Sequence, residues 1–378
     1  MRQMRAVIAI SIVAIVLAGC SPGKSNIEST GTWPCFKGNA LRTSYSDETG
    51  PEGLPSLTWV YESSSPFQSS PVISDSILYC GTGEGLLAIK IHSQEKLWFF
   101  NTVKKVYSTP AIDRDRIYFG SWQETFYCLD RESGKKKWTF ADTGAFTSSP
   151  LIDSNLVYAG NFSGNVYALD KDSGKMRWKF TTGNWVLGSP AVYGQKLFIG
   201  GVDNYMYCLD KLSGEEIWKF KAGDAIISTP AVDTANNVIY FGSHDSYIYC
   251  LNIDSGDKVW EFKTGSIVYS SPALYDGRIY CGSLDSTMYC LDIKTGDEIW
   301  HYKTGGEIFS SPLIFDGKVA FYSYDLNFYA LNADNGTLEY NYLSTDPSNA
   351  SPAIYRDELF IGNLGGTLYA FGNSPGDL

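Results

Sequence analysis

The residues of this chain best suited to catalysis or metal binding are three histidines, eight cysteines and a set of carboxylates at repeated turns. A metal site or a nucleophilic centre needs several such side chains to converge. His92, His244 and His301 lie far apart in the sequence and in different local contexts. We therefore expect exposed or locally bonded histidines, with no catalytic residue or metal ligand among them.

The carboxylates recur at one turn in successive repeats, at Asp203, Asp245, Asp285 and Asp325. Asp170 and Asp172 are spaced as in a calcium loop, but most repeats keep only one of the two and no bidentate Glu follows. Asp also forms turns by bonding its own backbone. The pattern thus favours turn formers and predicts no catalytic, metal or cofactor-binding residue.

The cysteines fall into distinct groups. Cys128, Cys208, Cys250 and Cys290 occupy one position of the repeat, which predicts small buried core residues. Cys281 and Cys290 flank the hairpin around Asp285 symmetrically, which leaves a cross-strand disulfide open.

Residues 1–19 have the layout of a cleavable export signal. Arg2 and Arg5 precede an apolar run from Ala6 to Ala18, which is too short to span a membrane stably. The following Leu-Ala-Gly-Cys resembles the lipobox of bacterial lipoproteins, which implies that Cys20 carries a lipid that anchors the chain to the membrane. The alternative is an ordinary secretory signal. Ser21, rather than Asp, at the next position suggests the outer membrane, facing the periplasm, in a host with two membranes, and otherwise the cell surface.

The net charge of −11 excludes one class of partner. An acidic surface repels phosphate backbones, so we expect no nucleic acid to bind. After Cys20, the polar stretch to residue 55 is predicted to form a tether and an N-terminal strap.

A repeat sets the fold of residues 56–378. A Ser/Thr-Pro pair recurs eight times at intervals of 39 to 42 residues, with prolines at Pro71, Pro110, Pro150, Pro190, Pro230, Pro272, Pro312 and Pro352. Each copy contains four short strand-like segments; in the third they are 149–153, 155–161, 165–170 and 175–181. This predicts an all-β, monomeric, eight-bladed propeller of four-stranded antiparallel blades.

The ends of the chain predict how the ring closes. The eighth copy stops after Ala370 without its aromatic strand, whereas residues 57–61 supply a spare one. We expect this N-terminal strand to complete the eighth blade, which removes open sheet edges.

One aromatic side chain marks each blade: Trp59, Trp98, Trp138, Trp178, Trp218, Trp260, Trp300 and Tyr340. The phrase from Ala168 to Trp178, with Asp170 and Gly174 inside it, resembles the docking motif of pyrroloquinoline-quinone (PQQ)-type propeller repeats. The resemblance implies that these aromatics pack between adjacent blades. The first copy departs from it, with Gln94 in place of the glycine.

The resembled family has two branches. The quinoprotein dehydrogenases bind PQQ with calcium, but they carry a vicinal cysteine pair and long insertions that this chain lacks. The lipid-anchored propeller of the β-barrel assembly machinery is similar in length, lipobox and blade number. The resemblance implies a non-enzymatic scaffold without a cofactor, which binds envelope proteins, with that machinery as a candidate partner. A PQQ- and calcium-binding redox protein and a surface ligand-binding propeller are the alternatives.

Two further repeat positions are predicted to surround the central channel. The residue before each proline is always Ser or Thr, which could form a polar ligand site or bond the local backbone. The residue two positions before this Ser or Thr varies between repeats and is often large and apolar. Together with the nearby Trp185, the large apolar residues are Tyr107, Leu187, Ile227, Tyr269 and Phe309. These six could form a partner-binding rim or pack between blades.

Overall fold

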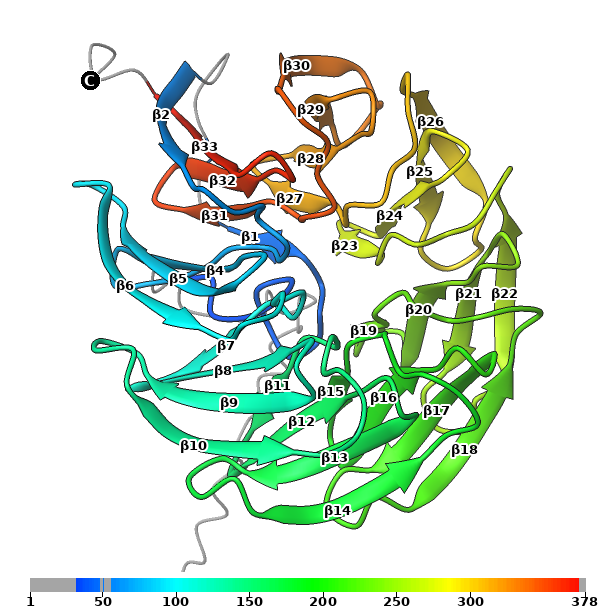
Figure 1. Ribbon diagram of the computed structural model, residues 1–378. Coiled ribbons are helices and arrows are strands. Elements are labelled where there is room, and N and C mark those ends of the chain that lie inside the picture. The colour runs from blue at the N-terminus through cyan, green and yellow to red at the C-terminus, as the bar shows by residue number, and fades with distance from the viewer. Residues whose placement is uncertain (1–31, 48–49, 51–55, 374–378) are drawn as a thin grey trace, which may run out of the picture. The chain divides into compact units, whose positions relative to one another are not determined.

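The computed structural model describes residues 32–47, 50 and 56–373, all within one compact unit that spans residues 31–378. The predicted signal peptide and the predicted lipid site at Cys20 lie outside the described residues. Eight sheets succeed one another around a ring (Figure 1), and each contains a blade of four antiparallel strands. The predicted eight-bladed all-β propeller is therefore confirmed. Within the described ranges, no helix is long and apolar enough to cross a membrane.

Each blade runs from an inner strand at the channel to an outer strand at the circumference. The inner strands are β3 (Val72–Ser74), β7 (Ala111–Asp113), β11 (Leu151–Asp153), β15 (Ala191–Tyr193), β19 (Ala231–Asp233), β23 (Ala273–Tyr275), β27 (Leu313–Phe315) and β31 (Ala353–Tyr355). The second strands are β4 (Ile77–Gly81), β8 (Arg116–Ser121), β12 (Leu156–Gly160), β16 (Lys196–Gly200), β20 (Val238–Gly242), β24 (Arg278–Ser283), β28 (Lys318–Tyr322) and β32 (Glu358–Gly362).

The third strands are β5 (Gly85–Lys90), β9 (Thr125–Asp130), β13 (Asn165–Asp170), β17 (Tyr205–Asp210), β21 (Tyr247–Asn252), β25 (Thr287–Asp292), β29 (Asn327–Asn332) and β33 (Thr367–Gly372). The outer strands are β6 (Glu95–Asn101), β10 (Lys136–Ala141), β14 (Met176–Thr181), β18 (Glu216–Lys221), β22 (Lys258–Lys263), β26 (Glu298–Lys303), β30 (Leu338–Leu343) and, in the eighth blade, β2 (Ser56–Glu62).

The eighth blade joins the two ends of the propeller. Strand β2 pairs antiparallel with β33, with Trp59 opposite Ala370, so the sheet order is β2-β33-β32-β31. The N-terminal strand thus closes the ring, as the sequence predicts.

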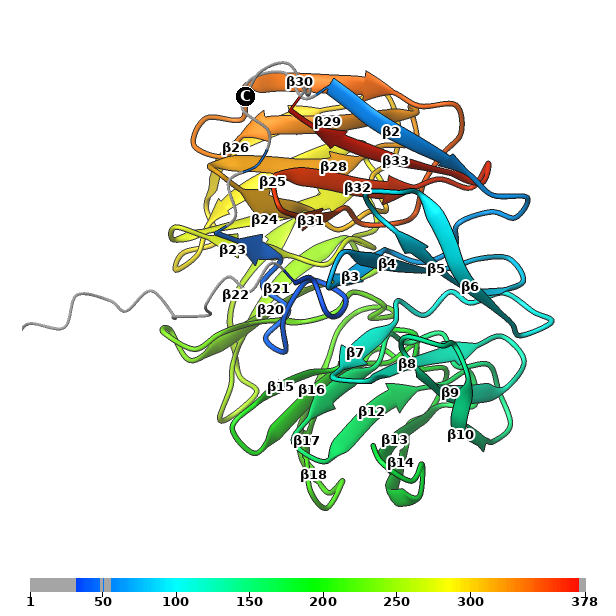
Figure 2. The same cartoon turned by 90° about the vertical axis from the view of Figure 1, so that its left-hand side faces the viewer.

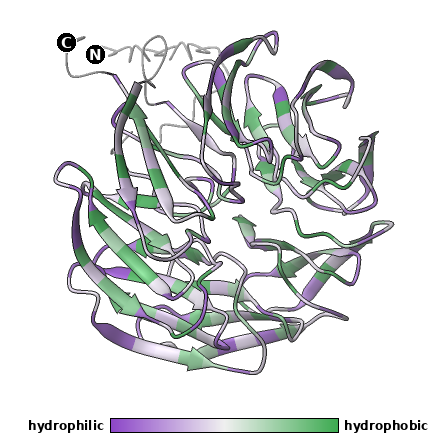
Figure 3. Ribbon diagram, turned by 45° about the horizontal axis from the view of Figure 1, so that its top comes forward, coloured by the Kyte–Doolittle hydropathy of each residue, from purple (hydrophilic) through white to green (hydrophobic). Residues whose placement is uncertain are grey.

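The hydrophobic core lies between neighbouring blades. One cluster, for example, joins Tyr158 and Trp178 of the third blade to Leu197 and Tyr207 of the fourth. The middle strands are buried almost throughout because a blade covers each of their faces, and Figure 3 shows hydrophobic residues spread through the strands.

A strap formed by residues 32–46 crosses one end of the channel, and Figure 2 shows it in dark blue on one face of the ring. Its backbone carbonyls accept hydrogen bonds of 2.8–3.2 Å from inner-strand N–H groups of six blades, at Ile73, Ile112, Val192, Val232, Leu274 and Ile314. It ends in β1 (Tyr45–Ser46), which pairs parallel with β27. The strap thus fastens the inner strands to one another.

The possible Cys281–Cys290 disulfide is ruled out. All seven described cysteines are buried and free. Cys281 pairs with Tyr289 and Cys290 with Tyr280, one register position apart. Successive residues of a strand point to opposite faces, so the two sulfur atoms cannot meet.

Candidate functional site

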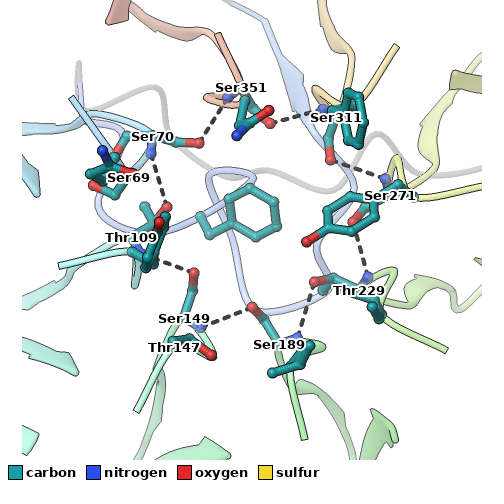
Figure 4. Close-up of a pocket in the computed structure, with 18 of the residues that line it drawn as sticks. Ser69, Ser70, Thr109, Thr147, Ser149, Ser189, Thr229, Ser271, Ser311 and Ser351 are labelled. Carbon is teal, nitrogen blue, oxygen red and sulfur yellow. Dashed lines mark hydrogen bonds between the residues drawn. The ribbon is translucent and has the colours of Figure 1, made fainter. Parts of the chain in front are cut away.

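A closed ring of hydrogen bonds surrounds the channel. It is formed by the hydroxyl residue that precedes each repeat proline, which we call the hydroxyl ring: Ser70, Thr109, Ser149, Ser189, Thr229, Ser271, Ser311 and Ser351. The backbone N–H of each donates to the hydroxyl of the next blade, at 2.9–3.2 Å. Figure 4 shows these bonds as an unbroken circle. The bonds thus run between blades, which differs from the local bonding considered from the sequence.

The strap closes one end of this channel. The Phe36 side chain lines the cavity there. Beside it lie Lys37 and Arg42, which are 2% and 0% exposed. The Arg42 guanidinium donates to the carbonyls of Pro150 and Pro190, at 3.0 and 3.1 Å, and the Lys37 ammonium donates to the Pro272 carbonyl.

These two cations have no carboxylate partner among the described residues. Burial lowers the pKa of Lys37 well below its ordinary value and also lowers the pKa of Arg42. Their carbonyl partners belong to residues that directly follow members of the hydroxyl ring. A guanidinium stays protonated in proteins, so Arg42 places a positive charge at the closed end of the channel, whereas the lowered pKa of Lys37 favours its neutral form.

The other end is open. In six blades the inner segment passes from the rim position, through the hydroxyl ring, to a residue that donates a hydrogen bond to the strap. That residue lies five positions after the rim position. At about 3.3 Å a residue, rim and strap are roughly 16 Å apart. The cavity between them has a volume of about 360 Å³. It is a blind funnel of the size that holds a small ligand or one or two residues of a peptide.

Two arcs of aromatic rings surround the mouth. In the first, Tyr107 contacts Trp122, Trp122 contacts Phe162 and Phe162 contacts Trp185, with centroid distances of 5.5, 4.9 and 4.8 Å. In the second, the pairs His244–Tyr269, Tyr269–Phe309 and Phe309–Tyr324 lie at 5.9, 5.5 and 4.5 Å. Trp122, Trp185 and Tyr269 remain 39%, 47% and 38% exposed. We call these two arcs, with Leu187 and Ile227 between them, the aromatic rim.

Five of the six predicted rim residues, all except Trp185, line the cavity. Trp185 lies against Phe162, outside that lining. The sequence analysis missed Trp122, Phe162 and Tyr324, which line the mouth from the turn after the second strand. Each lies twelve residues after a repeat proline, where large aromatics interrupt an otherwise polar turn. This spacing is the sequence signal that could have predicted the three residues at the mouth.

The other residues considered from the sequence have structural contacts. Asp203, Asp245, Asp285 and Asp325 each accept a hydrogen bond from a tyrosine hydroxyl of the next strand, at 2.6–2.8 Å. The indole N–H groups of Trp98, Trp138, Trp178, Trp218, Trp260 and Trp300 each donate to a backbone carbonyl of the following blade, at 2.9–3.4 Å. Trp59 and Tyr340 pack without such a bond in the described part of the chain.

The funnel does not fit the calcium ion that accompanies PQQ in the dehydrogenase branch. Calcium needs six to eight oxygen ligands, usually with carboxylates among them. The described residues around the cavity include hydroxyls and the amides of Gln68 and Asn349, but no Asp or Glu. No group of three or more His, Cys, Asp or Glu in the described part of the chain is arranged to hold a metal ion.

Comparison with known proteins identifies the family. A family model described as "Beta-alanine-activating enzyme, beta-propeller" matches residues 55–278, more than half of the chain. The chain belongs to this β-propeller family. A second model, "Outer membrane protein assembly factor BamB", matches residues 244–378. The chain is thus a PQQ-like propeller similar to BamB, as the docking motif predicts. No curated protein matches it.

Solved structures share this fold at low sequence identity. BamB from Moraxella catarrhalis is 15% identical, with a TM-score of 0.74 over 84% of this chain and 100% of its own. A europium-containing methanol dehydrogenase is 11% identical, with a TM-score of 0.80 over 91% and 98%. The quinohemoprotein alcohol dehydrogenase of Comamonas testosteroni is 13% identical, with a TM-score of 0.79 over 92% and 81%. An assembly factor and dehydrogenases therefore share the fold, and function has to be argued from the site.

Proposed function

We propose that this protein is a non-enzymatic, lipid-anchored propeller of the cell envelope, which binds another protein through the aromatic rim. The observation that carries the proposal is the rim itself. Large aromatic side chains surround the mouth of the blind funnel, and three of them, Trp122, Trp185 and Tyr269, remain more than one-third exposed. Such grouped, half-exposed aromatics are typical of protein-binding surfaces.

The identity of the partner is proposed from the family. The match to the assembly factor supports an envelope protein, with the β-barrel assembly machinery as the first candidate. The lipid on Cys20 would hold the propeller at the outer membrane, facing the periplasm, in a host with two membranes, and at the cell surface otherwise. A redox function is not proposed, because the funnel lacks the carboxylates that a calcium-bound quinone needs.

Photocrosslinking in native membranes tests the role of the rim. A photoreactive phenylalanine analogue replaces Trp185 or Phe309 in the full-length protein, and a matched control places it at Val259, which is 54% exposed on the outer strand β22. We expect a discrete crosslinked partner from the two rim positions and none from the control. Trp122→Ala should weaken the rim crosslinks. Equal labelling at all three positions, or none at the rim, would refute protein binding there.

A further inference from the structure

The hydroxyl ring has hydrogen-bonding capacity that the protein does not use. A hydroxyl has one proton to donate and two lone pairs. In each of the eight, one lone pair accepts the N–H of the preceding blade. None of the eight hydroxyl protons has an acceptor among the described residues, although all eight side chains are buried. The ring therefore presents eight O–H donors to the channel. Each hydroxyl also keeps one lone pair, so the charge around the ring decides whether a ligand there accepts or donates.

The charge around the ring favours an acceptor that is negative. The Arg42 guanidinium lies buried behind the closed end and stays charged, and no carboxylate lines the cavity within the described structure. Charges in a water-poor cavity interact more strongly than they do at the surface. A neutral ligand such as a sugar would gain nothing from this potential, whereas an anion would gain from both the potential and the donors.

The aromatic rim indicates what the anion is attached to. The rim residue lies two positions before the hydroxyl ring on each inner segment, about 7 Å along the channel. A ligand that reaches the ring must therefore place its next few atoms against rings such as Phe309 and Tyr107. An apolar or aromatic group suits that environment, because it buries its surface there.

We propose that the funnel binds a carboxylate joined to an apolar body, with the carboxylate at the hydroxyl ring and the apolar body at the aromatic rim. This rests on the proposed function, because it names the group of the partner that enters the funnel. Two sources share this chemistry. One is the C-terminal residue of a protein chain, and the other is a free organic acid.

Titration calorimetry on the folded protein tests the inference with two matched pairs of probes. N-acetyl-L-phenylalanine is compared with its amide, and the peptide N-acetyl-Ala-Ala-Ala-Phe with its amide; each pair differs only in the carboxylate. We expect the acids to bind about ten- to a hundredfold more tightly than the amides. Binding by the peptide acid alone indicates a chain terminus, whereas binding by both acids indicates that a free acid suffices. Equal affinity for acid and amide, or no binding by either acid, overturns the proposal.

The role of the ring is tested at Thr229. Thr229→Val keeps the shape of the side chain but removes its hydroxyl, whereas Thr229→Ser keeps the hydroxyl. We expect the valine variant to show a smaller preference for the acid, because one of the eight donors is lost, and the serine variant to keep the full preference. If the valine variant does not fold, as judged by circular dichroism, the acid–amide comparison on the unchanged protein still tests whether the funnel binds a carboxylate. Rim crosslinking without carboxylate binding would refute this inference and leave the proposed function standing.

Discussion

The backbone N–H of Ser351 donates a hydrogen bond of 2.9 Å to the hydroxyl of Ser70, which lies 281 residues earlier in the chain. This bond joins the last inner strand to the first and completes the hydroxyl ring. The circumference is closed separately, where β2 pairs with β33. The propeller is therefore closed twice: at its circumference by strand pairing, and at the channel by the hydroxyl of a single side chain.

Removing this inner bond should destabilise the ring. Ser70→Ala leaves the buried Ser351 N–H without an acceptor, which should lower the free energy of unfolding by about 1–3 kcal/mol. Ser70→Thr is the matched control, because Thr109 and Thr229 occupy the same position in other blades. Urea denaturation measures both variants. A threonine variant as unstable as the alanine variant would contradict the assigned role of the hydroxyl.

The docking tryptophans should be far more important for stability than those of the rim. Trp178 is 7% exposed, and its indole N–H donates to the Lys211 carbonyl at 3.0 Å. Trp178→Ala should cost about 3–5 kcal/mol, and Trp178→Phe less, because phenylalanine keeps part of the packing. Trp185→Ala, at the rim, should change stability by no more than about 0.5 kcal/mol. Similar losses at both positions, in the same denaturation experiment, would contradict this division.

The buried thiols should make the protein sensitive to alkali. Burial raises the pKa of Cys208 and Cys250 from 9.0 to about 12. Above pH 9 the unfolded chain releases these protons while the folded chain keeps them. The free energy of unfolding should therefore be unaffected by the thiols below pH 9 and fall between pH 9 and 12, by about 1 kcal/mol per thiol from pH 9 to pH 10.

A double variant isolates this effect. Cys208→Ala with Cys250→Ala introduces the residue that Ala168 already provides in the third blade. Its urea midpoint should fall less than that of the unchanged protein between pH 8 and pH 10. A thiol reagent at pH 8 should label the described cysteines only after denaturation, since all of them are buried. Identical pH dependence in the two proteins would show that other groups control the alkaline transition.

The sequence predicts those parts of the structure that follow from its period. Blade number, strand order and the closing role of Trp59 each depend on repeat spacing alone, and the structure agrees with all three. In the third blade, β11 to β14 lie within one or two residues of the predicted segments.

What the sequence does not predict depends on curvature and side-chain direction. The acceptor of the Ser351 N–H could not be foreseen, because it lies in a different blade and comes close only when the ring closes. Arg42 and Lys37 are polar residues in an N-terminal segment, where exposure is the ordinary expectation. Only the strap, by passing beneath the channel, buries them.

Tyr340 occupies the docking position without the hydrogen bond that a tryptophan makes. Its hydroxyl is buried and has no partner in the described structure, although the ring itself is well packed. Tyr340→Phe removes an unsatisfied polar group and keeps the ring. It should raise the free energy of unfolding by about 1 kcal/mol. A loss of stability on denaturation would instead point to a partner for the hydroxyl.

The joint between the eighth and first blades should also be improvable, at Gln94. Six other blades have a glycine at this position, and a Cβ atom there would lie 2.5–2.7 Å from the tryptophan ring of the preceding blade. Gln94 has a φ of 55°, in the region that favours glycine, and the indole of Trp59 makes no hydrogen bond in the described part of the chain. A side chain that carries a Cβ atom therefore stands where glycine gives room at the other joints.

Gln94→Gly should raise the free energy of unfolding by about 1 kcal/mol. It removes about 1–2 kcal/mol of left-handed backbone strain, while the greater freedom of glycine in the unfolded chain takes back part of that gain. The reverse exchange, Gly174→Gln, is the matched control and should cost more than about 2 kcal/mol, because its Cβ would meet the Trp138 ring at 2.5 Å. Urea denaturation of both variants decides. If Gln94→Gly destabilises the protein, the glutamine side chain must make contacts at this joint that stabilise the fold by more than its left-handed backbone costs.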